Sequence, residues 1–273
     1  MINNKSLKLS IVKSIIILSL ITIIVTTILF PQDRSYSQDI NIEETTPTPI
    51  STNSSGIESI TLDPGHGGKD KGNKGPENIY EKDITLDIGL KVEKLVSRNL
   101  GLRVILTRNI DRAIETPQRI ALANNNKTDL FISLHANSDS CSYTKGLTLY
   151  IQKTHRFIHY DDNVFQENNG KLSDYEAILF DMMVTKNTNQ SEKLAQILYG
   201  FFKKEGLSIR ETEHIDSVIL DGTIMPSIII DIGFMSNFQE GNMLTENGYR
   251  QKIAEVIYKS ISEYKRVIIE NIE

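Results

Sequence analysis

The sequence predicts an α/β fold: a single domain with a twisted, mostly parallel central sheet flanked by helices. Segments with strand character alternate with segments of helical periodicity between residues 57 and 265. Two of the strand segments, 130–134 and 226–232, are almost continuously apolar, as strands buried on both faces are. With 273 residues, of which 39% are hydrophobic and 24% charged, the chain has material for one such domain plus extensions.

A hydrophobic segment and a linker precede the expected domain. Lysines at positions 5, 8 and 13 stand before an uncharged run, 14–30, that is rich in isoleucine and leucine. This order is typical of export signals, so residues 1–30 are predicted to be a signal peptide or an uncleaved signal anchor. Residues 31–56 are rich in Ser, Thr, Asn and Pro and are predicted to be a flexible linker. We therefore expect an exported protein, in a periplasm or at a cell surface, whose contact with the membrane is only through its N-terminal segment.

The first half of the domain is expected to begin with a strand, 57–62, that ends in a glycine-rich turn carrying His66. The next segment, 84–99, fits both strand alternation and one helical face. We favour a helix because the apolar series outlasts a strand and Gly101 can end it. On this reading Glu81 lies at the start of the helix. A strand at 103–107, a helix at 117–126 and a strand at 130–134, which presents His135, complete this half.

The second half of the domain contains further strands and helices around a long insertion. The expected elements are a strand at 146–152, a helix at 191–205, a strand at 226–232 and a closing helix at 249–264. Residues 153–190 are interpreted as a long insertion that is a possible regulatory segment, and residues 266–273 as a C-terminal tail. The compact domain is therefore expected to span 57–265.

Two histidines and one carboxylate indicate a metal site. In parallel sheets ligands gather beyond the carboxyl ends of the strands, which is where His66 and His135 are expected. With Glu81 they make a set of three protein ligands that leaves a fourth position for water, as in catalytic sites for Zn²⁺. A structural zinc site usually uses four ligands with cysteines among them, and this chain has one cysteine, Cys141. Asp63 and Asp70 are interpreted as braces of the glycine turn.

Composition argues against nucleic acid as a partner. The net charge is −5, and the one basic cluster precedes the apolar N-terminal run. A pI near 5.6 agrees with this reading. With a single cysteine, no disulfide within the chain can form.

An ordered series of motifs resembles the zinc-dependent N-acetylmuramoyl-L-alanine amidases over roughly residues 57 to 265. The motifs are Asp63-Pro64-Gly65-His66-Gly67-Gly68, Glu81-Lys82-Asp83, Thr107-Arg108, Arg119 with Ala123-Asn124, Ser133-Leu134-His135-Ala136-Asn137 and Gly233-Phe234-Met235-Ser236-Asn237. The resemblance implies a cell-wall enzyme that cuts the amide bond between N-acetylmuramic acid and the L-alanine of the stem peptide in peptidoglycan. Arg108 and Arg119 are interpreted as structural residues that pair with buried carboxylates.

Asp231 stands where the resembled family carries the glutamate that acts as general base. Because aspartate is one methylene shorter, its carboxylate would lie about 1.5 Å farther back on an unchanged backbone. Three readings remain open: a base that reaches the water through a backbone shift, a slow enzyme, or a wall-binding regulatory protein that does not cut. We expect Asp231 to be the catalytic base.

Part of the insertion resembles a segment that covers the zinc cleft in relatives from division machineries. The residues Tyr175, Ile178, Leu179 and Met182 make a short apolar stripe, and Glu167 or Glu176 could occupy the open metal position. One reading is an autoinhibitory plug that an activating protein removes by acting on 153–190. The other is a loop that contacts substrate.

Overall fold

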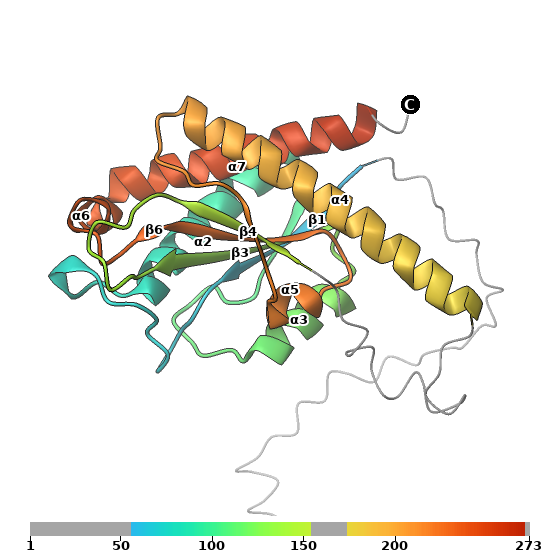
Figure 1. Cartoon of the computed structure of the whole chain (residues 1–273), viewed down its shortest axis with the longest axis horizontal. Coiled ribbons are helices and arrows are strands. Elements are labelled where there is room, and N and C mark those ends of the chain that lie inside the picture. Colours follow the sequence, from blue (N-terminus) through green and yellow to red (C-terminus); the bar gives the residue numbers. More distant parts are fainter. Residues whose placement is uncertain (1–55, 154–173, 271–273) are drawn as a thin grey trace, which may run out of the picture. The chain divides into compact units, whose positions relative to one another are not determined.

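The structure is a computed structural model that describes residues 56–153 and 174–270. Six strands form one sheet in the order β2-β1-β3-β6-β4-β5 (Figure 1). The strands are β1 (Ser59–Pro64), β2 (Arg103–Leu106), β3 (Leu130–Asn137), β4 (Thr148–Gln152), β5 (Glu213–Ile215) and β6 (Ser227–Phe234). The helices are η1 (Pro76–Asn78), α2 (Glu81–Leu100), α3 (Thr116–Asn125), α4 (Asp174–Lys204), α5 (Val218–Asp221), α6 (Phe238–Thr245) and α7 (Asn247–Glu270).

The sheet is mixed but mostly parallel. β1 pairs in parallel with β2 and β3, and β3 pairs in parallel with β6. β4 is antiparallel to β6 and parallel to β5. Parallel neighbours need a crossover connection, usually a helix, but residues 138–147, which join β3 to β4, contain none. β4 therefore runs back against the direction of β3. The predicted fold class is confirmed.

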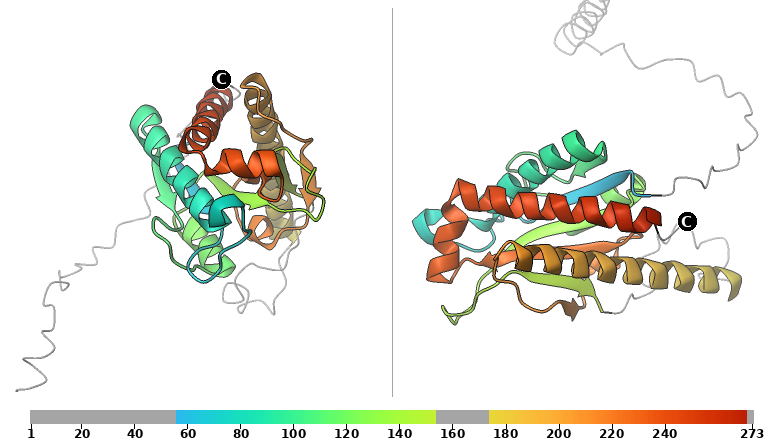
Figure 2. Two further views of the ribbon diagram at one scale, coloured as in Figure 1. Left: turned by 90° about the vertical axis from the view of Figure 1, so that its left-hand side faces the viewer. Right: turned by 90° about the horizontal axis from the view of Figure 1, so that it is seen from above.

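Helices cover both faces of the sheet. α2, α4 and α7 lie on one face, and α3 and α5 on the other (Figures 1 and 2). The main core lies under the first group, because each of these helices turns one apolar stripe toward the strands. That stripe is formed in α2 by Ile84, Ile88, Val92 and Val96, and in α7 by Ile253, Val256, Ile257 and Ile261, all of them buried. The sheet face under α3 and α5 carries more polar side chains, among them Thr61, Asp63, Ser133 and Asp231.

Two expectations about helix ends differ from the structure. α4 begins at Asp174, not at 191, so residues 174–190 of the expected insertion are helical. The stripe Tyr175, Ile178, Leu179 and Met182 was the signal for this, since its spacing is that of a helix face. α7 continues to Glu270, so most of the expected tail 266–273 is helical. The short elements η1, β5, α5 and α6 were not predicted, because each is too short to show a period.

Several predictions fall on residues outside the described ranges. They concern the signal segment 1–30, nearly all of the linker 31–56, the first part of the insertion and Glu167. Glu176 belongs to α4, but its side chain is not described. Within 56–153 and 174–270, no helix combines the length and the hydropathy needed to cross a membrane.

Candidate metal centre

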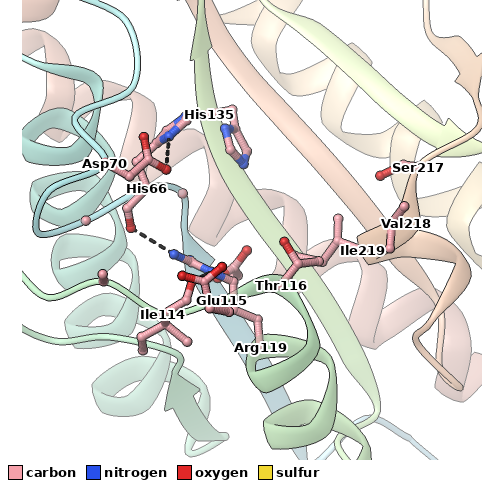
Figure 3. Close-up of a pocket in the computed structure, with 14 residues that line it drawn as sticks. His66, Asp70, Ile114, Glu115, Thr116, Arg119, His135, Ser217, Val218 and Ile219 are labelled. Atoms are coloured by element: carbon pink, nitrogen blue, oxygen red, sulfur yellow. Dashed lines mark hydrogen bonds and ion pairs between the residues drawn. The ribbon is translucent and has the colours of Figure 1, made fainter.

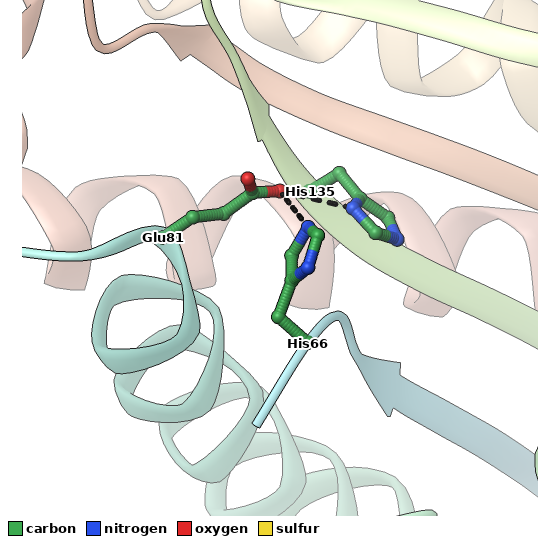
Figure 4. Close-up of side chains that lie close together, drawn as sticks. All are labelled: His66, Glu81 and His135. Carbon is green, nitrogen blue, oxygen red and sulfur yellow. Dashed lines mark hydrogen bonds and ion pairs between the residues drawn. The ribbon is translucent and has the colours of Figure 1, made fainter. Parts of the chain in front are cut away.

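The structure brings His66, Glu81 and His135 together from three separate elements (Figure 4). His66 lies in the turn after β1, Glu81 is the first residue of α2, and His135 lies in β3. Glu81 Oε1 is 3.0 Å from His66 Nε2 and 2.9 Å from His135 Nδ1. The donor atoms of all three side chains lie within 4.8 Å of one another. The spatial convergence expected from the sequence is therefore present.

Glu81 is fixed by hydrogen bonds to both carboxylate oxygens. Its Oε1 accepts a hydrogen bond from the backbone N–H of Ala136 at 2.9 Å. Its Oε2 accepts hydrogen bonds from the backbone N–H and the side-chain amide of Asn73, at 2.9 and 3.0 Å. Burial acts to raise the pKa of Glu81, but the hydrogen bonds to His135 and His66 outweigh it and hold the pKa well below its usual range. The Glu81 carboxylate is thus ionised and held in a fixed orientation, as a metal ligand needs to be.

The turn that carries His66 has a strained backbone. His66 adopts φ 60°, which is uncommon for a residue with a side chain. Two glycines allow the close packing around it. A Cβ on Gly65 would lie 2.4 Å from His135 Cε1, and one on Gly72 would lie 2.6 Å from both Glu81 Oε2 and His66 Cδ2.

Asp70 orients the His66 ring from the side away from Glu81. Its Oδ2 lies 2.8 Å from His66 Nδ1, which leaves Nε2 facing Glu81. The hydrogen bond to Glu81 raises the pKa of His66 against the effect of burial, and Asp70 adds to the rise. A carboxylate on the second ring nitrogen is the usual partner of a metal-binding histidine. The sequence reading made Asp70 only a brace of the turn and did not recognise this contact.

Arg119, Arg108 and Asp63 form a buried network beneath the same turn. Arg119 donates to Asp63 Oδ1 at 2.6 Å and to the carbonyls of Pro64 and His66 at 2.9 and 2.8 Å. Arg108 donates to the carbonyls of Pro64 and Gly65 at 2.9 and 2.8 Å. Arg119 pairs with a buried carboxylate as predicted, whereas Arg108 is structural through hydrogen bonds to carbonyl groups and to the Thr85 hydroxyl. They satisfy carbonyl groups that the unusual backbone of the turn leaves without partners.

The donor set suits zinc. In a tetrahedral site with bonds of about 2.0–2.1 Å, two ligand atoms are separated by about 3.3 Å. The present separations of 3.0 and 2.9 Å reach that value with shifts of a few tenths of an ångström. Two imidazoles and a carboxylate are also the ligands of catalytic zinc sites. His66, Glu81 and His135 therefore fit a zinc ion.

Asp231 lies beside His135 in a row that crosses the sheet. The two residues are register partners in the β3–β6 pair, so their side chains lie on the same face. Asp231 is 6% exposed, and Asn137 faces its carboxylate with both its backbone amide and its side chain. Burial, followed by repulsion from Glu81, raises the pKa of Asp231 well above its usual value. The sequence analysis did not foresee the role of Asn137, which depends on a bulge between His135 and Asn137.

A cavity of about 330 Å³ opens at the histidines (Figure 3). Gly65, His66, Arg119 and His135 are among the residues that line it. Residues 113–116 before and at the start of α3 form one wall, and residues 217–219 at the start of α5 form the other. Asp231 does not line this cavity, and neither does the exposed stripe of α4. The expected docking of that stripe on the cleft is therefore not seen among the described residues.

Comparison with known proteins identifies N-acetylmuramoyl-L-alanine amidases among the relatives of this chain. Residues 60–263 match the family model described as N-acetylmuramoyl-L-alanine amidase. The probable N-acetylmuramoyl-L-alanine amidase AmiB of Haemophilus influenzae is 30% identical over 225 residues, which is 74% of this chain and 51% of that protein. The chain thus spans about half the length of that relative.

Two solved structures extend the similarity to the fold. The catalytic domain of CwlV, an N-acetylmuramoyl-L-alanine amidase from Bacillus (Paenibacillus) polymyxa var. colistinus, is similar with a TM-score of 0.61 and 28% identity, covering 77% of this chain and 99% of that one. The CwlD amidase from Clostridioides difficile, solved in complex with the GerS lipoprotein, gives a TM-score of 0.62 and 26% identity over 77% of this chain and 99% of that one.

Proposed function

Because the chain belongs to the family of N-acetylmuramoyl-L-alanine amidases, we propose that it is an exported zinc hydrolase of peptidoglycan. The bond cut is the amide between N-acetylmuramic acid and the L-alanine of the stem peptide. The observation that carries the proposal is the convergence of His66 Nε2, Glu81 Oε1 and His135 Nδ1 within 4.8 Å beside a cavity.

Three residues bind the metal in this proposal, and a fourth transfers the proton. Zn²⁺, when bound, lowers the pKa of a coordinated water to about 7 and polarises a carbonyl group. His66, Glu81 and His135 would hold the ion, and Asp70 orients the His66 ring so that Nε2 faces Glu81. Asp231 takes the proton of the attacking water and passes it to the leaving nitrogen. Its place next to His135 in the sheet supports this role.

A second candidate function follows from the burial of Asp231. A base must be ionised before it can accept a proton, and the raised pKa of Asp231 reduces the ionised fraction at neutral pH. This observation favours a slow enzyme or a wall-binding regulatory protein that retains its zinc site. Such a protein would pellet with sacculi and generate no new amino termini.

The test is product analysis. The zinc-loaded protein is incubated with purified sacculi, and the soluble products are identified by mass spectrometry beside those of His66→Ala. We expect about one zinc per chain and free stem peptides that begin with L-alanine, neither of them with the variant. Glycan fragments or cleaved crosslinks as the only products would show that the substrate bond is wrong.

Export and regulation complete the proposal. The basic and apolar residues of 1–30 support export, and fractionation with N-terminal sequencing of the mature protein tests it. The stripe on α4 supports an activating partner, since Tyr175, Ile178, Leu179 and Met182 are 47–70% exposed. The CwlD amidase, which was solved with the GerS lipoprotein, is a relative with a protein partner. Ile178→Ser with Met182→Ser should remove stimulation by envelope extract and leave basal activity unchanged.

A further inference from the structure

Two buried polar atoms without hydrogen-bond partners in the described part of the chain belong to neighbouring residues of β4 and β6, one of them the proposed base. Thr148 and Asp231 are register partners in the antiparallel β4–β6 pair, so their side chains lie on the same face. Neither Thr148 Oγ1 nor Asp231 Oδ1 has a hydrogen-bond partner of ordinary geometry among the described residues. Both residues are nearly inaccessible, with exposures of 1% and 6%. Buried polar atoms without partners are rare, because each retains the cost of losing its contact with water.

The two atoms are chemically complementary, and a third group lies near them. A hydroxyl can donate to a carboxylate oxygen, yet the pair forms no direct hydrogen bond. Tyr150 follows Thr148 by two residues on the same face of β4. Burial and then the charge of Asp231 raise the pKa of the Tyr150 hydroxyl, while Thr148 acts to lower it. A buried water typically makes about three hydrogen bonds, and three polar groups meet here.

We propose that Thr148, Tyr150 and Asp231 bind a buried water, and that Thr148 acts through this water as a positioning residue for the Asp231 carboxylate. The terminal torsion of an aspartate side chain is broad, so one anchored oxygen does not fix the plane of the carboxylate. Asn137 holds the group on one side, and the water holds Oδ1 on the other. The catalytic part of this inference rests on the proposed function, while the water site itself does not.

The water site is tested on the metal-free protein. A high-resolution crystal structure should show an ordered water about 3 Å from both Thr148 Oγ1 and Asp231 Oδ1. Thr148→Val should lower the denaturation midpoint, because the water that bonds to Asp231 Oδ1 loses its hydrogen bond to Thr148. If the hydroxyl truly lacks a partner, the same change removes a buried unpaired group and raises the midpoint. A raised midpoint, or an empty space between the two atoms, overturns the proposal.

The positioning role is tested by kinetics. Thr148→Val should lower kcat about 10- to 100-fold with KM and zinc content unchanged, and Thr148→Ser should restore kcat. In the Asp231→Asn background, Thr148→Val should cause no further loss of kcat, because no base remains to be oriented. Unchanged kcat in Thr148→Val, or failure of serine to restore it, refutes the role.

A matched control separates this role from general loss of packing. Thr61 is also buried on this face of the sheet, but its hydroxyl bonds directly to Thr128 at 2.9 Å. Thr61→Val should lower the midpoint and leave kcat unchanged. If the wild-type protein releases no L-alanine peptides, the proposed function fails, and the crystallographic water and the midpoints still decide the water site.

Discussion

Replacing Arg119 with methionine should weaken both the fold and the zinc site. The side chain of Arg119 is buried, and it donates to Asp63, to the carbonyls of Pro64 and His66, and to the carbonyl of Ile114 at 2.8 Å. Its loss leaves the Asp63 carboxylate buried without its cationic partner. Breaking a buried ion pair from one side costs about 3–5 kcal/mol. For a domain of this size that loss lowers Tm by roughly 6–20 °C.

The effect on zinc has a different origin. Arg119 holds the carbonyl of His66, whose backbone is in the left-handed region, and without this contact the turn can relax and move the imidazole. Loss of such outer contacts typically weakens metal binding about 10- to 100-fold. Urea denaturation of the metal-free protein measures the first effect, and competition with a chelator measures the second.

A matched control and a double variant sharpen the test. Arg103→Met removes an exposed arginine that bonds the carbonyl of Asn126, and the free energy of unfolding should change by no more than about 0.5 kcal/mol. Asp63→Asn combined with Arg119→Met should cost less than the sum of the single changes, because each single change leaves an unpaired group. Arg119→Met with wild-type zinc affinity would refute the idea that this arginine supports the histidine turn.

Four further outcomes are expected. Asp70→Asn should weaken zinc binding about 10- to 100-fold by chelator competition, and it should leave unfolding of the metal-free protein within about 1 kcal/mol, because Asp70 is exposed. Asp231→Glu should raise turnover of sacculi by up to about 100-fold at unchanged zinc content, and if it and Asp231→Ala both match wild type, the base lies elsewhere. Burial acts to raise the pKa of Asp87, but hydrogen bonds from Lys91 and Arg250 lower it, so its contribution is present above the unfolded pKa of about 3.9 and lost as pH falls through the folded value. The difference in unfolding free energy between Asp87→Asn and wild type should therefore be about 1 kcal/mol or less at pH 7 and shrink below about pH 4. Dialysis against a chelator should abolish the release of peptides, and added zinc should restore it; activity that survives complete zinc removal would contradict the metal role.

The elements that could be predicted are long helices with a repeated apolar pattern and strands that are apolar along their whole length. The stripe of α2 and the apolar strands β3 and β6 are visible in the sequence, and they place His135 at a strand end. β5 has only three residues, too few to show alternation. The first turns of α4 were not predicted to be helical, because they are exposed and little supported by packing. Their apolar stripe was visible in the sequence.

The candidate metal ligands could be predicted from the sequence, but the residues that orient them could not. The side chains of histidine and glutamate are common zinc ligands, so His66, Glu81 and His135 could be proposed from the sequence. Asp63 and Asp70 both flank the turn, and only the fold shows that Asp70 contacts His66 while Asp63 pairs with Arg119. The pairing of Thr148 with Asp231 depends on strand register, which residues 83 positions apart do not reveal.

The order of the chain separates the proposed metal ligands from the proposed base. His66, Glu81 and His135 belong to the β1–α2–β3 portion, whereas Asp231 arrives on β6, and the β3–β6 pairing is what brings the base beside a ligand. A slip of one residue in that pairing would turn Asp231 to the opposite face of the sheet while leaving every donor in place. Natural variation can therefore tune or silence the hydrolytic step without dismantling the metal pocket.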